Sequence, residues 1–271
     1  MKFIALTIRL IFVGLITIHM ITGSIIADPA SGSGELILSS VCDSLNHSLN
    51  QIDQNLAKIA GVFRTSDMRN TSASDIIGPY QIDQEGLGGI ILFVGDTVYP
   101  SLNSSAMKKP FDSSILQDMA INDSIRYIKP KMSQEIEITD SKPIIMISRP
   151  TVIDDIIGAA VAILIPWSFC DAIVQPRING TNILCIVMQL DGIILYSSSS
   201  GELAKIPPEN FLTEFPTFRD VKRAMIAEKD GHMNYELWRA DRSEPKARDA
   251  YWSTITLHGT EWRVMIAEPV K

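Results

Sequence analysis

Side chains suited to acid-base or metal chemistry are few and scattered in this sequence. Its four histidines are His19, His47, His232 and His258, and none lies in an HExxH pattern or at zinc-ligand spacing from a cysteine. The chain contains no GxSxG elbow, no GxxxxGK[ST] phosphate loop and no GxGxxG motif after a strand. An active site needs convergent acids, bases or nucleophiles. We therefore expect a protein that is not an enzyme and that holds no metal and no cofactor.

A different group of side chains suits the binding of a small charged molecule. The stretch "DSIRYIKP" places Tyr127 beside Arg126, and Asp140 follows in "EIEITDSKP". An arginine can hold a carboxylate through two hydrogen bonds, an aromatic ring can line the apolar part of a ligand, and an aspartate can pair with an ammonium group. Tyr99 and Arg149 are two further candidates. The alternative is equally simple: solvated arginines and tyrosines that belong to the core.

The acidic pair and the cysteines each allow two interpretations. Asp154 and Asp155 stand between two apolar runs, where they either bind a cation or form a tight turn. Cys42, Cys170 and Cys185 are too few for a disulfide scaffold and lack metal-ligand spacing. They are either three buried thiols or one thiol beside a Cys170–Cys185 disulfide.

The N-terminus predicts export from the cytoplasm. Lys2 and Arg9 precede an apolar run at residues 10–27, and a small, polar, turn-rich stretch follows. As a helix rising about 1.5 Å per residue, this run would nearly cross a hydrocarbon core about 30 Å thick. Residues 1–27 are therefore either a secretory signal peptide or an uncleaved membrane anchor, and we expect an extracellular or cell-envelope location.

Bulk composition narrows the class of protein. The chain has 271 residues, of which 46 % are hydrophobic and 20 % are charged, as is typical of globular proteins. The formal net charge is -7, and no basic run of the nucleic-acid-binding type occurs. We therefore expect no nucleic acid partner.

A long helix is the first element that the sequence predicts after the leader. Apolar residues recur at steps of three and four from Leu36 to Phe63, which is the spacing of an amphipathic helix. We place this helix at residues 34–65. The polar and turn-rich stretch after it is mostly loop.

The rest of the chain repeats one order of elements. A strand, a turn, a strand, a helix and further antiparallel strands are predicted in 88–168 and again in 181–271. The fold class is therefore α+β, with the long helix followed by two tandem modules, 66–170 and 171–271.

The last strands form a hairpin around the turn at Leu257-His258-Gly259-Thr260. We expect His258 to be a solvated turn residue. Trp262 lies in the final strand and Trp167 ends an apolar run, so both are expected in the core.

These segments resemble a known family. The stretches "VMQLDGIILYSSSSGEL" and "YWSTITLHGTEWRVMIAEP", behind a long helix that follows an N-terminal membrane segment, resemble the extracellular Cache domains, PAS-like sensor modules of bacterial and archaeal receptors. The final hairpin is similar to that of methanogen-type Cache proteins. The resemblance covers about 35–271 and is strongest at 186–201 and 251–268.

The resemblance implies a double Cache architecture with a ligand pocket in the membrane-distal module, 66–170, and a membrane-proximal module, 171–271. Amino-acid-binding members use an arginine followed by aromatic residues, another tyrosine and a later aspartate. Arg126, Tyr127 and Asp140 match that pattern, whereas Ile128 and Lys129 depart from it.

We therefore expect a non-catalytic extracytoplasmic sensor protein that binds a small molecule of the amino acid, carboxylate or amine class. The chain ends at Lys271 with no signalling region, so we also expect a separate signalling partner. The alternative function is an envelope structural, adhesion or partner-binding protein with the same fold.

Overall fold

A computed structural model of the chain describes residues 34–66, 71–80, 83–100, 131–133, 144–199, 216–237 and 246–270. The predicted leader, residues 1–27, lies outside the described residues. Within the described ranges no helix is both long and apolar enough to cross a bilayer.

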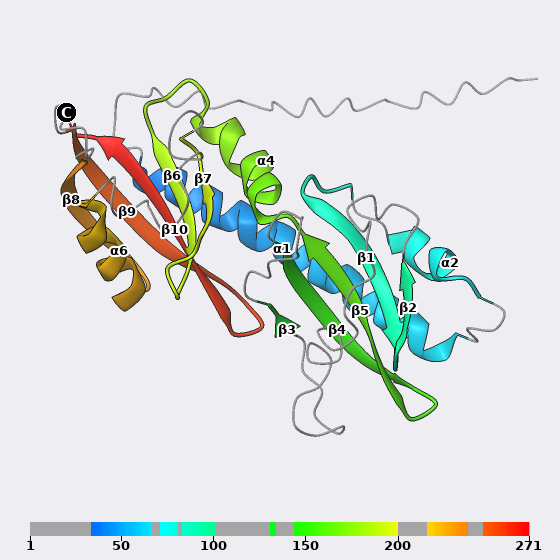
Figure 1. The fold of residues 1–271 in the computed structure, drawn as a ribbon. Coiled ribbons are helices and arrows are strands. Elements are labelled where there is room, and N and C mark those ends of the chain that lie inside the picture. The colour runs from blue at the N-terminus through cyan, green and yellow to red at the C-terminus, as the bar shows by residue number, and fades with distance from the viewer. Residues whose placement is uncertain are drawn as a thin grey trace, which may run out of the picture. The chain divides into compact units, whose positions relative to one another are not determined.

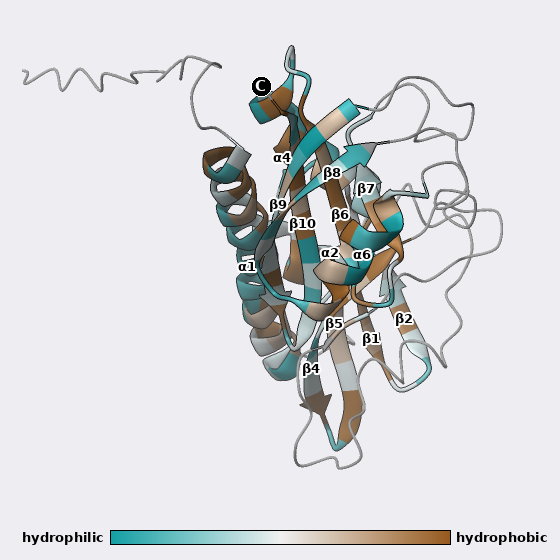
Figure 2. Ribbon diagram, turned by 90° about the vertical axis from the view of Figure 1, so that its left-hand side faces the viewer, coloured by the Kyte–Doolittle hydropathy of each residue, from teal (hydrophilic) through white to brown (hydrophobic). Residues whose placement is uncertain are grey.

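The long helix is present as predicted. It is α1 (Gly34–Thr65), and one stripe along it is buried. In Figure 2 it carries hydrophilic and hydrophobic bands in turn along its length, as expected for an amphipathic helix. Glu35 in the first turn and Arg64 in the last turn both complement the helix dipole. Asp53 is the one charged residue of the buried stripe.

The first of two antiparallel sheets, called the distal sheet here, follows this helix. Its strands lie in the order β2-β1-β5-β4-β3. The elements of this region are α2 (Ala73–Ile77), η1 (Gly78–Tyr80), β1 (Leu87–Val94), β2 (Thr97–Pro100), β3 (Lys131–Met132), β4 (Ile145–Ile153) and β5 (Ile156–Leu164).

The second sheet, the proximal sheet, repeats the arrangement. Its order is β7-β6-β10-β9-β8, the same sequence of positions as in the distal sheet. The elements here are α4 (Pro166–Ile178), β6 (Leu184–Gln189), β7 (Ile194–Ser197), α6 (Phe218–Ala227), β8 (Gly231–Leu237), β9 (Lys246–Leu257) and β10 (Thr260–Pro269). The predicted α+β fold class is confirmed. The proposed module boundary at 170/171 stays a prediction, and it falls inside α4.

Two hairpins turn through left-handed backbone. Asp154 and Asp155 have φ of 49° and 64°, and His258 and Gly259 have φ of 52° and 81°. Positive φ at both central residues is the type I′ pattern, whose twist matches that of the flanking strands. The aspartates are therefore turn residues, as one of the two interpretations held, and among the described residues no acidic, histidine or cysteine cluster suits a metal.

Both sheets pack against α1, which runs along them in Figure 1. One core cluster joins the helix stripe to Ile147 and Ala160 of the distal sheet and to Val187 and Val264 of the proximal sheet. The three cysteines are buried and free in this core, so the disulfide interpretation is not supported. Both sheets are therefore supported by the same hydrophobic core on α1.

The two tryptophan predictions differ in outcome. Trp262 is 1 % exposed, as expected for a core strand residue. The prediction for Trp167 was wrong, since this side chain is 45 % exposed. The apolar strand ends at Leu164 and α4 starts at Pro166, so Trp167 lies in the first helical turn, where its ring meets Tyr196 at 6.0 Å between centroids.

Candidate functional site

The distal sheet has a buried apolar face on the side away from α1, called the outer face here. It is a separate core cluster, and the fully buried members are Ile91, Phe93, Met146, Ala159, Val161 and Ile163. They alternate along the strands with residues that pack in the α1 core. β5, the central strand, contributes the short side chains of Ala159 and Val161.

Ser148 brings a buried hydroxyl group to the outer face. Ser148 is 0 % exposed and stands opposite Val161 in the register of β4 and β5, which puts both side chains on the same face. Arg149 is the single charged residue of β1, β2, β4 and β5, and it points to the other face. The described side chains of the outer face thus form an apolar wall with a polar group near its centre.

The predicted ligand-binding residues fall into two groups. Arg126, Tyr127 and Asp140 lie outside the described residues, in the connections between β2 and β4. Tyr99 is half-buried, stands opposite Leu92 and packs against the α1 core. Arg149 likewise faces α1. The structure therefore brings Tyr99 and Arg149 to the helix side of the distal sheet and not to the outer face.

Arg149 belongs to a cluster that joins three elements. Its Nε donates to Asp53 Oδ1 at 2.6 Å, and its Nη2 pairs with Asp53 Oδ2. His258 Nε2 lies 2.7 Å from the same Oδ1. Asp53 comes from α1, Arg149 from β4 of the distal sheet, and His258 from the turn between β9 and β10 of the proximal sheet. One carboxylate therefore connects both sheets to the helix.

The pKa of Asp53 reflects its contacts with Arg149 and His258. Burial alone would raise the pKa of this carboxyl, but the hydrogen bonds from His258 and Arg149 and their charges outweigh it, and the pKa lies below the usual 3.8. Asp53 is therefore a carboxylate at neutral pH. The expectation that His258 is solvated was wrong, because its side chain is 14 % exposed and contacts Asp53.

Sequence reasoning missed Asp53, although a signal was present. Asp53 follows Leu49 by four residues and precedes Leu56 by three, so it stands on the apolar stripe of the predicted helix. A lone acid in such a stripe calls for a buried partner. Nothing in the local sequence identifies Arg149 or His258 as that partner.

The hairpin turn makes a second contact with the distal sheet. Thr260 Oγ1 donates to the Met132 carbonyl at 2.9 Å. The next residue, Ser133, is bonded twice to Met146 of the outer face: its N–H donates to the Met146 carbonyl at 2.8 Å, and its Oγ accepts from the Met146 N–H at 2.7 Å. A short path therefore connects the outer face to the proximal hairpin: Met146 is bonded to Ser133, and the adjacent Met132 is bonded to Thr260.

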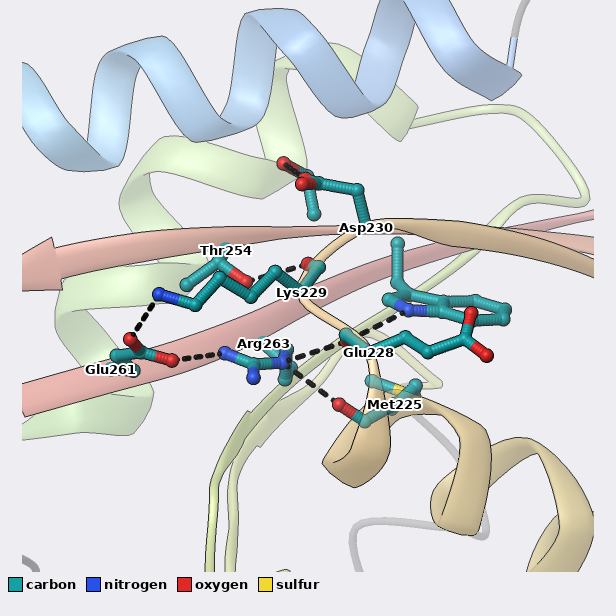
Figure 3. A network of polar contacts seen from close by, with 9 residues as sticks. Met225, Glu228, Lys229, Asp230, Thr254, Glu261 and Arg263 are labelled. Atoms are coloured by element: carbon teal, nitrogen blue, oxygen red, sulfur yellow. Dashed lines mark hydrogen bonds and ion pairs between the residues drawn. The ribbon is translucent and has the colours of Figure 1, made fainter.

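A polar network inside the proximal module anchors α6 (Figure 3). Arg263 is 3 % exposed, and its Nε donates to the carbonyls of Met225 at 2.8 Å and Glu228 at 3.2 Å. Glu261 accepts from Arg263 Nη1 at 2.9 Å and from Lys229 Nζ at 2.7 Å. The guanidinium thereby caps the carbonyl end of α6, which favours positive charge.

The buried cysteines are poor nucleophiles. Burial, followed by the charges of Asp43 and Asp230, raises the pKa of Cys42 to about 12, and burial raises the pKa of Cys170 and of Cys185 further. Because the thiolate is the reactive form, these thiols are inert at neutral pH.

No family model matches this sequence, and no curated protein does either. The fold does match solved structures. An extracellular ligand binding receptor from Desulfohalobium retbaense superposes with a TM-score of 0.61 at 18 % identity, over 88 % of this chain and 40 % of that one. This chain thus spans less than half the length of that receptor.

Two other matches cover nearly all of both chains. The periplasmic sensory domain of the Campylobacter jejuni chemoreceptor Tlp1 gives a TM-score of 0.57 at 11 % identity, over 87 % of this chain and 92 % of that one. The ligand-binding domain of an amino acid chemoreceptor of Pseudomonas aeruginosa, in complex with GABA, gives 0.55 at 14 % identity, over 86 % and 96 %. The chain has the double Cache fold of such sensory domains.

Proposed function

We propose that this protein is an extracytoplasmic sensor domain that binds one small molecule on the outer face of the distal sheet and catalyses no reaction. The observation that carries the proposal is the buried apolar wall of the outer face, in a fold shared with chemoreceptor sensory domains. Ligand sites are mostly apolar, with a few polar groups that fix orientation.

The proposed ligand is an amino acid or a related carboxylate or amine. Ala159 and Val161 are short side chains at the centre of the wall, which suits an apolar ligand group of modest size. Sensory domains of the same fold were solved with isoleucine and with valine bound. In this proposal Arg126 binds the carboxylate, Asp140 the ammonium group and Tyr127 the apolar part, each by the chemistry of its side chain.

Tyr99 and Arg149 act differently in this proposal. Both lie on the α1 side of the distal sheet, so they support the sheet and do not touch a ligand on the outer face. The distal module, 66–170, would bind the ligand and the proximal module, 171–271, would pass the response on. Export directed by residues 1–27, membrane attachment through residues 10–27 and a separate signalling partner complete the proposal.

A ligand screen tests the proposal. The full chain in detergent is heated with single amino acids, carboxylates and amines, and unfolding is followed by tryptophan fluorescence. A ligand at about 100 times its Kd adds about 2.7 kcal/mol to the free energy of unfolding, which shifts Tm by several degrees. Hits from one chemical class support the proposal, and a flat screen of a cooperatively melting protein contradicts it.

Arg126→Ala tests the predicted carboxylate contact. The substitution should weaken binding of an amino acid hit by about 1.5 to 3 kcal/mol, because a charged hydrogen bond is lost. Arg223→Ala is the control and should leave both Kd and Tm nearly unchanged, because Arg223 is an exposed residue of α6 in the proximal module. Equal Kd in the parent and in Arg126→Ala would remove Arg126 from the site.

One observation favours the alternative of a partner-binding envelope protein. Leu190, Ile193 and Ile226 are 36 to 40 % exposed, and Gly192 between the first two lies against Ile226. Exposed apolar side chains that gather at one place are typical of interfaces. If no compound in the ligand screen raises Tm, the proposed function becomes partner binding at this surface.

A further inference from the structure

The turn between β9 and β10 is held by one contact to α1 and one to β3 of the distal sheet. The turn comprises residues 257–260 and is called the hairpin turn here. His258 meets Asp53 of α1, and Thr260 meets Met132 of β3. A small movement of β3 or β4 would therefore reach this turn directly.

The first connection runs through β3. Met146 belongs to the outer face, and two hydrogen bonds join its backbone to Ser133. Ser133 follows Met132, whose carbonyl accepts the Thr260 hydroxyl. Met132 and Ser133 are both buried, which limits the access of water to these bonds.

The second connection runs through the Asp53 carboxylate. Arg149 lies on β4, three residues after Met146, and pairs with both oxygens of Asp53. His258 binds one of these oxygens. The side chain of Asp53 is 7 % exposed, so a displaced Arg149 would leave a buried charge without its main partner. A shift of β4 is therefore expected to move Asp53 and His258 with it.

Buried polar atoms without hydrogen-bond partners lie beside the hairpin turn, and their cost in free energy opposes the stabilising contacts of the turn. Trp262 follows Thr260 by two residues and stands opposite Gln189 in the register of β10 and β6. Both atoms of the Gln189 amide and Trp262 Nε1 are buried and have no hydrogen-bond partner. Buried polar groups in native proteins are nearly always paired, and each unpaired one is costly. A shift of the hairpin that pairs or hydrates these atoms would recover that cost.

We propose that the hairpin turn is the element that couples the two modules. Its His258 and Thr260 contacts hold the proximal hairpin in the position seen here. A ligand on the outer face that displaces β3 and β4 releases the hairpin. This inference rests on the proposed function, because it assigns the route by which a ligand on the outer face changes the proximal module. The contacts of the turn favour the present position of the hairpin, and the unpaired polar atoms of Gln189 and Trp262 favour a shifted position. A two-state element requires such opposing contributions to the free energy.

The test uses the ligand-free full chain, so its outcome is independent of the ligand screen. Met146→Ala disturbs the outer face at the residue bonded to Ser133, and Ile91→Ala is the matched control on β1 of the same face. Amide hydrogen exchange of residues 246–269 is measured by mass spectrometry. Met146→Ala should speed exchange there by about fivefold or more, and Ile91→Ala by less than twofold, as expected for a specific coupling.

The same pair is then measured with the turn contacts removed. His258→Asn keeps a residue that tolerates left-handed backbone before Gly259, and Thr260→Val removes only the hydroxyl. In this double variant Met146→Ala should no longer speed proximal exchange relative to its own background. Equal effects of Met146→Ala and Ile91→Ala, no effect of either, or an effect that survives in the double variant would each overturn the coupling role.

Discussion

At the scale of residues, Asp53 shows how one buried charge is made stable. A carboxylate on the apolar stripe of a helix would be costly alone, but Arg149 binds both of its oxygens and His258 binds one. The side chains of Asp53 and His258 are 7 % and 14 % exposed, whereas Arg149 keeps 28 % of its side chain exposed. The cluster therefore adds specificity to the packing of α1 on both sheets more than it adds net stability.

The pH dependence of unfolding follows from the pKa of Asp53. Its folded pKa lies below 3.8, so its contribution to stability is present above about pH 5 and is lost as the pH falls through the folded pKa. Asp53→Asn should cost about 2 to 3 kcal/mol at pH 7, since Arg149 loses its partner, and markedly less at pH 3. Urea unfolding at several pH values measures the difference.

Asp43→Asn is the control for that series. Asp43 lies exposed on the same helix, so its substitution should change the free energy of unfolding by less than about 0.5 kcal/mol. An Asp53→Asn penalty that stays constant from pH 7 to pH 3 would contradict the lowered pKa.

At the scale of elements, most of this fold could be predicted because its signals are local. The stripe of α1, the alternation in β9 and β10, and the turn residues Asp154 and Gly259 each lie within a few positions of the element they define. Trp167 was misjudged because the strand run ends before it and a helix starts at Pro166. The apolar run alone does not show that change.

Two tryptophans test the account of the elements. Trp262→Ala should lose about 3 to 5 kcal/mol of stability, because a fully buried indole leaves a cavity between β10 and α1. Trp167→Ala should lose less than about 1 kcal/mol, because the side chain is largely exposed. Denaturant unfolding of both variants gives the comparison, and losses of similar size would refute the assigned burial.

The candidate site was less predictable than the elements, for a physical reason. Asp53, Arg149 and His258 are separated by about a hundred residues each, and only the packing of α1 against two sheets brings them together. Arg149 was predicted to line the ligand pocket, whereas in the structure it binds the carboxylate of Asp53 on the helix side of the sheet. The predictions for Arg126, Tyr127 and Asp140 stay predictions.

At the scale of the molecule, two sheets of identical strand order share one helix and one core, while each keeps an outer face of its own. The proximal outer face is covered by α6, which Arg263 fixes in place. In the proposed function, the distal outer face binds the ligand and the proximal module passes the response on.

The most direct measurement of that central claim is the amino acid thermal-shift panel, run on the parent and on two filled variants. Ala159→Leu adds bulk to the distal outer face, and Ala250→Leu adds the same bulk to the proximal one; each should cost about 1 to 3 kcal/mol from overpacking. The account predicts that an amino acid raises Tm by several degrees in the parent and in Ala250→Leu but not in Ala159→Leu. A shift that persists in Ala159→Leu, or a parent that no compound stabilises, would contradict it.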